Sequence, residues 1–121
     1  MGNAGRETPP LVEYHILKGM RFSAHPNVPK SVSAVLQEIG QDPKVEELIL
    51  FGSRAFGDHQ SGSDVDVAIK GDLTREEWIS IKDIANQGRS LYWISLVHLN
   101  TSPQELRNRI VATGTTLYVR T

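Results

Sequence analysis

The sequence contains no cysteine. This absence excludes disulfide frameworks, thiolate zinc sites and cysteine nucleophiles, and it fits a reducing compartment. Long apolar runs are also lacking, since none approaches the roughly 18 to 20 residues of a bilayer-spanning helix, and the N-terminus lacks the basic-then-apolar order of a signal peptide. We therefore expect a cytoplasmic protein that has no membrane partner.

An excess of charge of either sign is lacking too. The 121 residues include 13 Lys and Arg against 14 Asp and Glu, which gives a formal net charge of -1. The basic residues are scattered, so no general nucleic-acid surface is indicated. A hydrophobic share of 39% and a charged share of 22% are typical of a globular protein, and the length allows one core.

The apolar pattern divides the chain into an N-terminal arm and one domain. Residues 1–29 begin with a small, polar, proline-terminated stretch and continue without clear periodicity, so we expect a tail followed by a short strand or an irregular arm. The domain is placed at residues 30–121. Apolar residues at helical spacing predict a helix over residues 31–39, closed by Gly40 and Pro43.

Two later segments carry helix-start signals. Thr74 stands three residues before Glu77 and predicts a capping box at the start of a helix that continues to about residue 86. Ser102 and Glu105 repeat this pattern, with Pro103 at the first helical position of a second helix. Both helices are expected to bury one apolar side.

Four segments predict strands. Residues 45–51 form an apolar, mostly β-prone run, residues 64–70 alternate apolar and acidic side chains, and residues 91–99 are rich in β-branched and aromatic types. Residues 115–120 predict a last short strand after Gly114. The element order indicates an α/β (α+β) fold in which helices pack on a small mixed sheet.

Gly52 and Ser53, directly after the first of these strands, form a candidate phosphate site. Glycine lets the chain turn sharply and lets a ligand approach the backbone, and free N–H groups beside a hydroxyl suit phosphate oxygens. Ten residues separate Ser53 from Asp64, and strand alternation places Asp64 and Asp66 on one face, about 7 Å apart. Paired carboxylates acting together with substrate phosphates are typical magnesium ligands.

Each of these features also has a plain structural explanation. A Gly-Ser pair is usually only a turn, and an exposed pair of aspartates needs no ligand. The combination is more specific, because a strand, Gly-Ser, ten residues, Asp-x-Asp and an apolar strand follow one another in this order. It favours a site for a nucleotide and a divalent metal.

The segment from Phe51 to Ile69, FGSRAFGDHQSGSDVDVAI, resembles the motif of the DNA polymerase β-like nucleotidyltransferase superfamily, and specifically of its minimal (MNT) branch. Residues 32–118 have the size and element order of that family's domain. Residues 105–118, ELRNRIVATGTTLY, resemble its usual last helix and closing strand. The resemblance implies a polymerase β palm-like fold and the transfer of a nucleoside monophosphate, expected to be AMP from ATP, to a hydroxyl.

The family's roles can be assigned to individual positions of this chain. The resemblance implies that Gly52 and Ser53 hold the β- and γ-phosphates and that Asp64 and Asp66 bind two Mg²⁺ ions. The acceptor hydroxyl would attack the α-phosphorus in line. The expected nucleotide-binding residues are Gly52, Ser53, Arg54 and Ser63.

The resemblance also implies a protein partner. MNT proteins are commonly paired with small helical HEPN proteins, the two acting as antitoxin and ribonuclease toxin. We therefore expect a helical HEPN partner or a homodimer, and a tyrosine of the HEPN protein is one candidate acceptor.

Ser95 departs from the family pattern, because the superfamily usually has a third carboxylate on this later strand. A serine supplies no negative charge and is a poor base at neutral pH. Two functions therefore stay open: an active nucleotidyltransferase that uses Asp64, Asp66 and Ser95, or a degenerate, nucleotide-binding antitoxin that acts by binding its partner.

The remaining histidines and tryptophans have plain explanations. His15, His25 and His59 show no metal-ligand spacing, although His59 lies in the loop between Ser53 and Asp64 and is a candidate substrate contact. His98 is expected on the face opposite Ser95. Trp78 and Trp93 are expected in the core or facing a partner.

Overall fold

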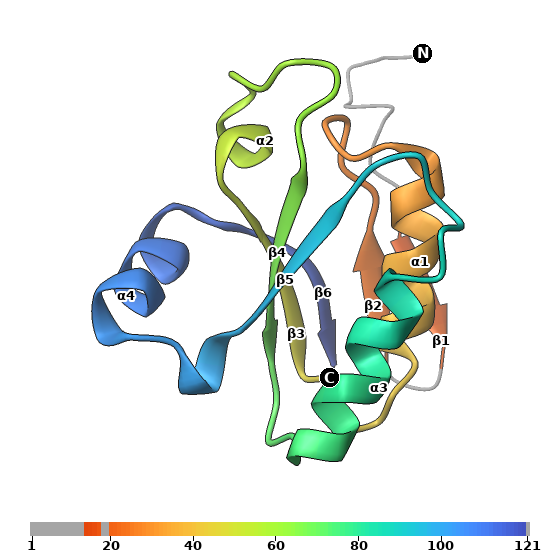
Figure 1. The fold of residues 1–121 in the computed structure, drawn as a ribbon, viewed down its shortest axis with the longest axis vertical. Coiled ribbons are helices and arrows are strands. Elements are labelled where there is room, and N and C mark those ends of the chain that lie inside the picture. Colours follow the sequence, from red (N-terminus) through yellow and green to blue (C-terminus); the bar gives the residue numbers. More distant parts are fainter. Residues whose placement is uncertain (1–13, 18–19, 121) are drawn as a thin grey trace.

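The computed structural model describes residues 14–17 and 20–120 of the chain (Figure 1). The predicted tail, the first ten residues, lies outside the described residues. Within them, no helix is long and apolar enough to cross a membrane.

The described chain forms one mixed sheet with helices on both faces (Figure 1). The sheet order is β1-β2-β6-β3-β4-β5; β4 and β5 run parallel and the other neighbours antiparallel. The predicted fold class is confirmed. In chain order the elements are β1 Tyr14–Leu17, β2 Met20–Ser23, α1 Lys30–Gly40, β3 Glu47–Phe51, α2 Ser53–Phe56, β4 Val65–Lys70, α3 Arg75–Ala85, β5 Ile94–His98, the 3-10 turn Leu99–Thr101, α4 Gln104–Thr113 and β6 Thr115–Arg120.

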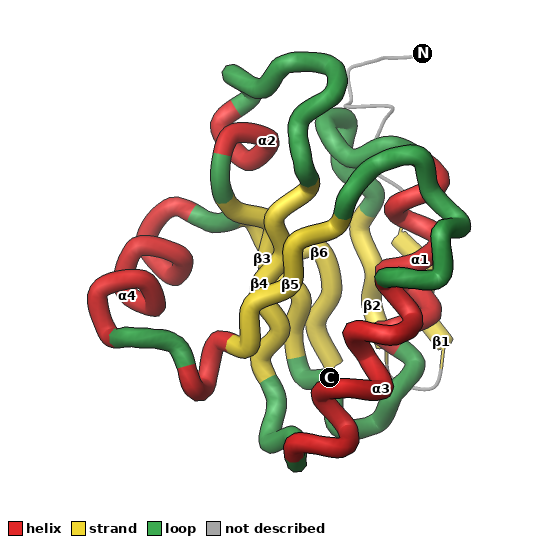
Figure 2. Tube along the Cα trace, in the orientation of Figure 1, coloured by secondary structure: helices red, strands yellow, loops and turns green. Residues whose placement is uncertain are grey.

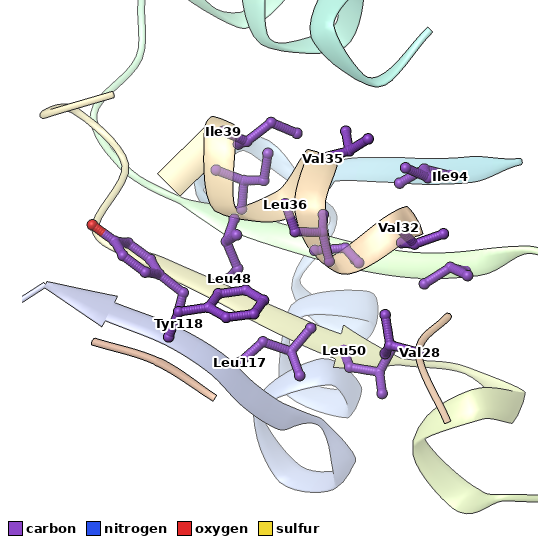
Figure 3. Close-up of a cluster of buried hydrophobic side chains, with 14 of the residues drawn as sticks. Val28, Val32, Val35, Leu36, Ile39, Leu48, Leu50, Ile94, Leu117 and Tyr118 are labelled. Atoms are coloured by element: carbon purple, nitrogen blue, oxygen red, sulfur yellow. The ribbon is translucent and has the colours of Figure 1, made fainter. Parts of the chain in front are cut away.

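The sheet separates a large core from a small one. The large core lies under α1 and α3, where Leu48 and Leu50 of β3 pack with apolar residues of α1 and β6 (Figure 3). The small core lies under α4 on the opposite face, where Ile49 of β3 packs with Ala68 and Ile110. Because strand residues alternate between faces, every second residue of β3 and β4 points toward α4.

Helix α1 forms where the apolar spacing predicts it. The residues that share one helical face, Val32, Val35, Leu36 and Ile39, are all buried. Arg120 closes the C-terminal end of this helix, donating from Nη2 to the carbonyls of Gly40 and Asp42, each at 2.9 Å. A cation at this position also offsets the negative end of the helix dipole.

The two predicted capping boxes have different outcomes. In α3 the box is present: the Thr74 N–H donates to Glu77 Oε1 at 2.8 Å, and the Glu77 N–H donates to Thr74 Oγ1 at 3.1 Å. In α4 the prediction is wrong, because Pro103 is the N-cap rather than the first helical residue and no side chain caps the helix. The Ser102 hydroxyl instead donates to the His98 carbonyl at 2.9 Å and stabilises the preceding 3-10 turn.

Strand β5 is shorter than the predicted 91–99. It begins at Ile94, because the Ser90 hydroxyl accepts from the Tyr92 N–H at 3.1 Å and bends the chain just before the strand. It ends at His98, where the 3-10 turn begins. Alternation along the strand is unaffected, since the central residues keep their register.

The described part of the N-terminal arm belongs to the sheet. Strand β2 pairs antiparallel with β6, with Phe22 opposite Tyr118. Phe22 and Val28 are buried in the large core. Residues 14–17 and 20–29 therefore extend the domain that we had begun at residue 30.

Candidate functional site

Gly52 holds a backbone conformation that other residues rarely adopt. Its φ of 74° and ψ of −159° lie in a region essentially restricted to glycine. A Cβ at this position would lie 2.4 Å from Oδ2 of Asp66. The Asp66 carboxylate therefore rests against the backbone of the Gly-Ser turn, at the end of β3.

Asp66 and Asp64 extend from the face of the sheet that α4 covers. Val65 and Val67 are buried in the large core, so the alternate residue Asp66 points the other way. Asp66 is half-buried, and Asp64 is exposed just before β4 begins. Burial raises the pKa of the Asp66 carboxyl above its ordinary value, and the negative charge of Asp64 raises it further. The two carboxylates are thus close enough to repel each other.

Ser95 completes this group from the neighbouring strand. The parallel register of β4 and β5 pairs it with Asp66. Its hydroxyl lies near enough to the Asp66 carboxylate to favour the ionised form, and this lowers the pKa of that carboxyl, against the larger effects of burial and of Asp64. The described residues contain no group of three or more His, Cys, Asp or Glu arranged to hold a metal, because a hydroxyl stands at the third position.

The donor set fits a magnesium ion that also contacts a phosphate. Mg²⁺ prefers oxygen ligands and binds through one or two carboxylates, taking its other ligands from waters and phosphates. Asp64 and Asp66 are two such carboxylates, and their mutual repulsion is the cost that a bound cation would offset. A cavity of about 200 Å³ is lined by Ser95 but by neither aspartate, and a second cavity, of about 320 Å³, is lined by none of these three residues.

Arg54 has a different surrounding from the one we expected. Its side chain is only 4% exposed. The guanidinium donates to the carbonyl of Ser63 from Nε at 3.1 Å and from Nη2 at 2.9 Å, and Nη2 reaches the carbonyl of Ser61 at 3.3 Å. It also lies 5.3 Å from the ring centre of Tyr92. These contacts favour a structural role, fixing the loop that precedes Asp64, over the predicted phosphate contact.

Asn27 supports Arg54 from the segment before α1. Its Nδ2 donates to the Arg54 carbonyl at 2.9 Å, and Arg54 Nη1 donates back to the Asn27 carbonyl at 2.9 Å. Neither Asn27 nor Tyr92 was predicted from the sequence to belong to the site. No local pattern marks them, because each meets Arg54 only through the fold.

The loop between α2 and β4 (Figure 2) ends in Ser63 and Asp64, the two residues directly before β4. The Ser63 hydroxyl accepts from the Gln60 N–H at 3.0 Å, so it helps to shape the loop. His59, in the same loop, has a buried Nδ1 that no described residue hydrogen-bonds. Whether Ser63 or His59 contacts a substrate stays a prediction.

His98, Trp78 and Trp93 have different surroundings in the fold. His98 donates from Nε2 to the Gly71 carbonyl at 2.8 Å and stacks on Trp78, with ring centres 5.3 Å apart. Trp78 packs against the large core, so His98 lies on the face opposite Ser95, as predicted. Trp93 is 62% exposed, so of the two predicted positions, in the core or facing a partner, the core is excluded for it.

In this mixed sheet a Gly-Ser turn follows one strand, and an Asp-x-Asp stands at the start of the next. A polar residue on the strand after that is in register with the second aspartate. This arrangement defines a nucleotidyltransferase-type domain. The profile of the family described as "Polymerase beta, Nucleotidyltransferase" matches residues 34–121. The chain belongs to this family.

Two similar solved structures come from toxin-antitoxin pairs. One, described as a toxin-antitoxin with AMP-PNP, is 23% identical with a TM-score of 0.54, and the match covers 72% of this chain and 69% of that one. The other, a mutant of the toxin-antitoxin MntA-HpeT, is 21% identical with a TM-score of 0.52, covering 71% and 68%. At these identities the likeness shows the fold. No curated protein matches the chain significantly.

Proposed function

We propose that this chain is a minimal nucleotidyltransferase that binds ATP with Mg²⁺ and transfers AMP to a hydroxyl. The observation that carries the proposal is the contact of the Asp66 carboxylate with the Gly52 backbone, beside the charge of Asp64. It joins the predicted phosphate turn and the predicted metal ligands into one site. Family membership supports the same reaction class.

In this proposal each residue has a distinct task. The Gly52 backbone and the Ser53 hydroxyl bind the β- and γ-phosphates, and Asp64 and Asp66 hold the metal ions. Mg²⁺, when bound there, would supply positive charge that stabilises the attacking and leaving oxygens. The bond between the acceptor oxygen and the α-phosphorus forms while the α–β phosphoanhydride bond breaks, pyrophosphate leaves and the proton of the acceptor hydroxyl passes to water. Catalysis consists mainly of positioning and electrostatics.

Ser95 favours a second function. Its hydroxyl can orient an acceptor or a metal-bound water, but it does not remove a proton efficiently at neutral pH. A domain that keeps the nucleotide site and transfers slowly would still work as an antitoxin by binding its toxin. The two solved structures described as toxin-antitoxin support a protein partner, for which we propose a helical HEPN protein; a homodimer is the alternative assembly.

Thermal unfolding tests the site. Mg²⁺ with ATP should raise the Tm of the wild type, because a ligand that binds only the folded state stabilises it by mass action. The double variant Asp64→Asn, Asp66→Asn should lose the shift, and the control Asp72→Asn, an exposed acid on another loop, should keep it. An equal shift in wild type and double variant would show that ATP binds elsewhere.

Labelled adenylate distinguishes the two functions. The protein is incubated with Mg²⁺, α-labelled ATP and the proteins that co-purify with it from its own cells. Transfer to a partner supports the enzyme. A partner that is bound but stays unlabelled, together with an intact thermal shift, supports the antitoxin that acts by binding.

A further inference from the structure

The indole of Trp93 is 62% exposed, although it stands directly before a strand of the sheet. Its backbone is fixed, because the Trp93 carbonyl accepts from the Val65 N–H at 2.9 Å. Its neighbour Tyr92 is part-buried and packs against the large core. The two adjacent aromatic rings therefore point to opposite faces of the sheet, and Trp93 takes the face of the carboxylates.

The strand register places Trp93 beside Asp64. Val65 pairs with Ile94 in the parallel β4–β5 ladder, so the residues one step earlier on each strand are neighbours. Adjacent strands lie about 4.8 Å apart, and side chains alternate between faces. Asp64, Asp66, Trp93 and Ser95 consequently share one face, and the indole borders any ligand held by Asp64.

The order of the strands gives the direction in which a nucleotide would lie. Gly52 ends β3, the two aspartates stand on β4, and Trp93 precedes β5, which is next in the sheet. A triphosphate whose tail rests on Gly52 and whose α-phosphate meets the metals on β4 continues into its nucleoside over β5. We infer that Trp93 is the platform on which the base of the bound nucleotide stacks, an inference that rests on the proposed function.

A cavity of about 200 Å³ lies beside Trp93 at the outer edge of β5. Trp93 and Ser95 line it together with residues at the C-terminal end of α3 and on the large-core side of β5: Lys82, Ala85, Asn86, Ile94 and Leu96. The cavity therefore lies between α3 and the edge of the sheet, and the Trp93 indole borders it while remaining exposed.

Fluorescence tests the inference, because the chain has only two tryptophans. In the variant Trp78→Phe, Trp93 is the single indole. Mg²⁺-ATP should change its emission, since a stacked base alters the surroundings of the indole, whereas Mg²⁺-tripolyphosphate, which has no base, should bind and leave the emission unchanged.

Binding to variants in the wild-type background gives the second readout. Trp93→Ala should weaken ATP binding about tenfold, the typical effect of losing one base-stacking partner, and leave tripolyphosphate binding unchanged. Trp93→Phe should retain most of the ATP affinity. The matched control Leu91→Ala removes a side chain that is 101% exposed two residues earlier, and it should change neither ligand.

The outcomes separate this inference from the proposed function. If tripolyphosphate binds and Trp93→Ala leaves the ATP affinity unchanged, the phosphate and metal site stands and the stacking platform is wrong. A constant Trp93 emission on ATP binding would contradict the platform as well, and would leave the indole as a contact for a protein partner. If neither ligand binds the wild type, the proposed function fails and this inference fails with it.

Discussion

The close approach of Gly52 and Asp66 limits which residues can occupy either position. Any residue with a Cβ at position 52 would need both a strained backbone and a displaced carboxylate, because that Cβ would lie 2.4 Å from Asp66 Oδ2. The sequence motif predicted that these two residues take part in one site. It did not predict their contact, since the distance depends on how β3 ends against β4.

The pKa of Asp66 leads to a prediction about stability. Because this pKa is raised by burial and by Asp64, the ionised carboxylate costs folding free energy at neutral pH. The cost falls as the pH drops through the raised pKa and is gone below the ordinary value of 3.8. Asp66→Asn should therefore stabilise the metal-free protein slightly at neutral pH, by less than about 1 kcal/mol for a partly exposed group.

Urea unfolding in EDTA at neutral pH and near pH 3.8 measures this difference. The gain from Asp66→Asn should shrink toward the lower pH. The control Asp72→Asn changes an exposed acid outside the site and should show no comparable trend. A variant that is less stable than wild type at neutral pH would mean that the Asp66 carboxylate makes a net stabilising contact.

Ser95→Asp restores the missing carboxylate. In the observed register the new acid faces Asp66, so without metal it should lower the Tm, and Mg²⁺ should reverse this loss more strongly than in wild type. With ATP and an acceptor, a carboxylate that orients or deprotonates the hydroxyl can raise the rate about a hundredfold. Thermal unfolding with and without Mg²⁺ and transfer of labelled adenylate measure both effects.

The neutral variant Ser95→Asn is the matched control and should gain neither metal binding nor rate. If Ser95→Asp unfolds the protein and Mg²⁺ does not rescue it, the side chain at position 95 does not reach the metal ligands. If wild type already transfers at the rate of Ser95→Asp, a hydroxyl suffices at this position.

At the scale of elements, the loop between α2 and β4 depends on a single guanidinium. Arg54 binds carbonyls at Ser61 and Ser63, and Asn27 connects it to the segment before α1. Arg54→Met should destabilise the fold by about 2–4 kcal/mol, because it removes a buried guanidinium and leaves several part-buried carbonyls without their donor. It should also weaken Mg²⁺-ATP binding, since Asp64 directly follows this loop.

Urea unfolding and amide exchange over residues 57–64 measure the effect. Arg89→Met is the control, because its exposed ion pair with Glu38 is worth at most about 1 kcal/mol. A loss of stability no greater than in this control would contradict the assigned role. Arg54→Lys keeps the charge but lacks the planar fork of donors, so it should rescue little.

The two predicted helix starts show what a local sequence pattern can and cannot predict. Thr74 and Ser102 occupy similar sequence settings, and only Thr74 caps its helix. The sequence pattern identifies hydrogen-bond donors and acceptors within a few residues. It does not show that a carbonyl of the preceding turn competes for the same hydroxyl. At Ser102 the His98 carbonyl uses the hydroxyl, and that carbonyl is positioned by the end of β5.

At the scale of the whole molecule, periodicity predicted most elements and the faces they bury. It also predicted that Ser95 and His98 point to opposite faces, because alternation in a strand is independent of the rest of the fold. Side-chain contacts between distant parts of the chain could not be predicted from periodicity. Asn27 with Arg54 and Arg120 with Gly40 join residues far apart in sequence, and only the folded chain brings them together.

Strand β6 lies between β2 and β3 in the sheet, although it is the last strand of the described chain. During synthesis β1 and β2 therefore leave the ribosome long before the strand that connects them to β3 exists. Pairing over so long a stretch of chain is slow, and exposed strand edges promote aggregation while it is incomplete. The nascent chain should thus keep its first hairpin apart from the rest of the sheet until residues 115–120 have emerged, and only then close its largest core.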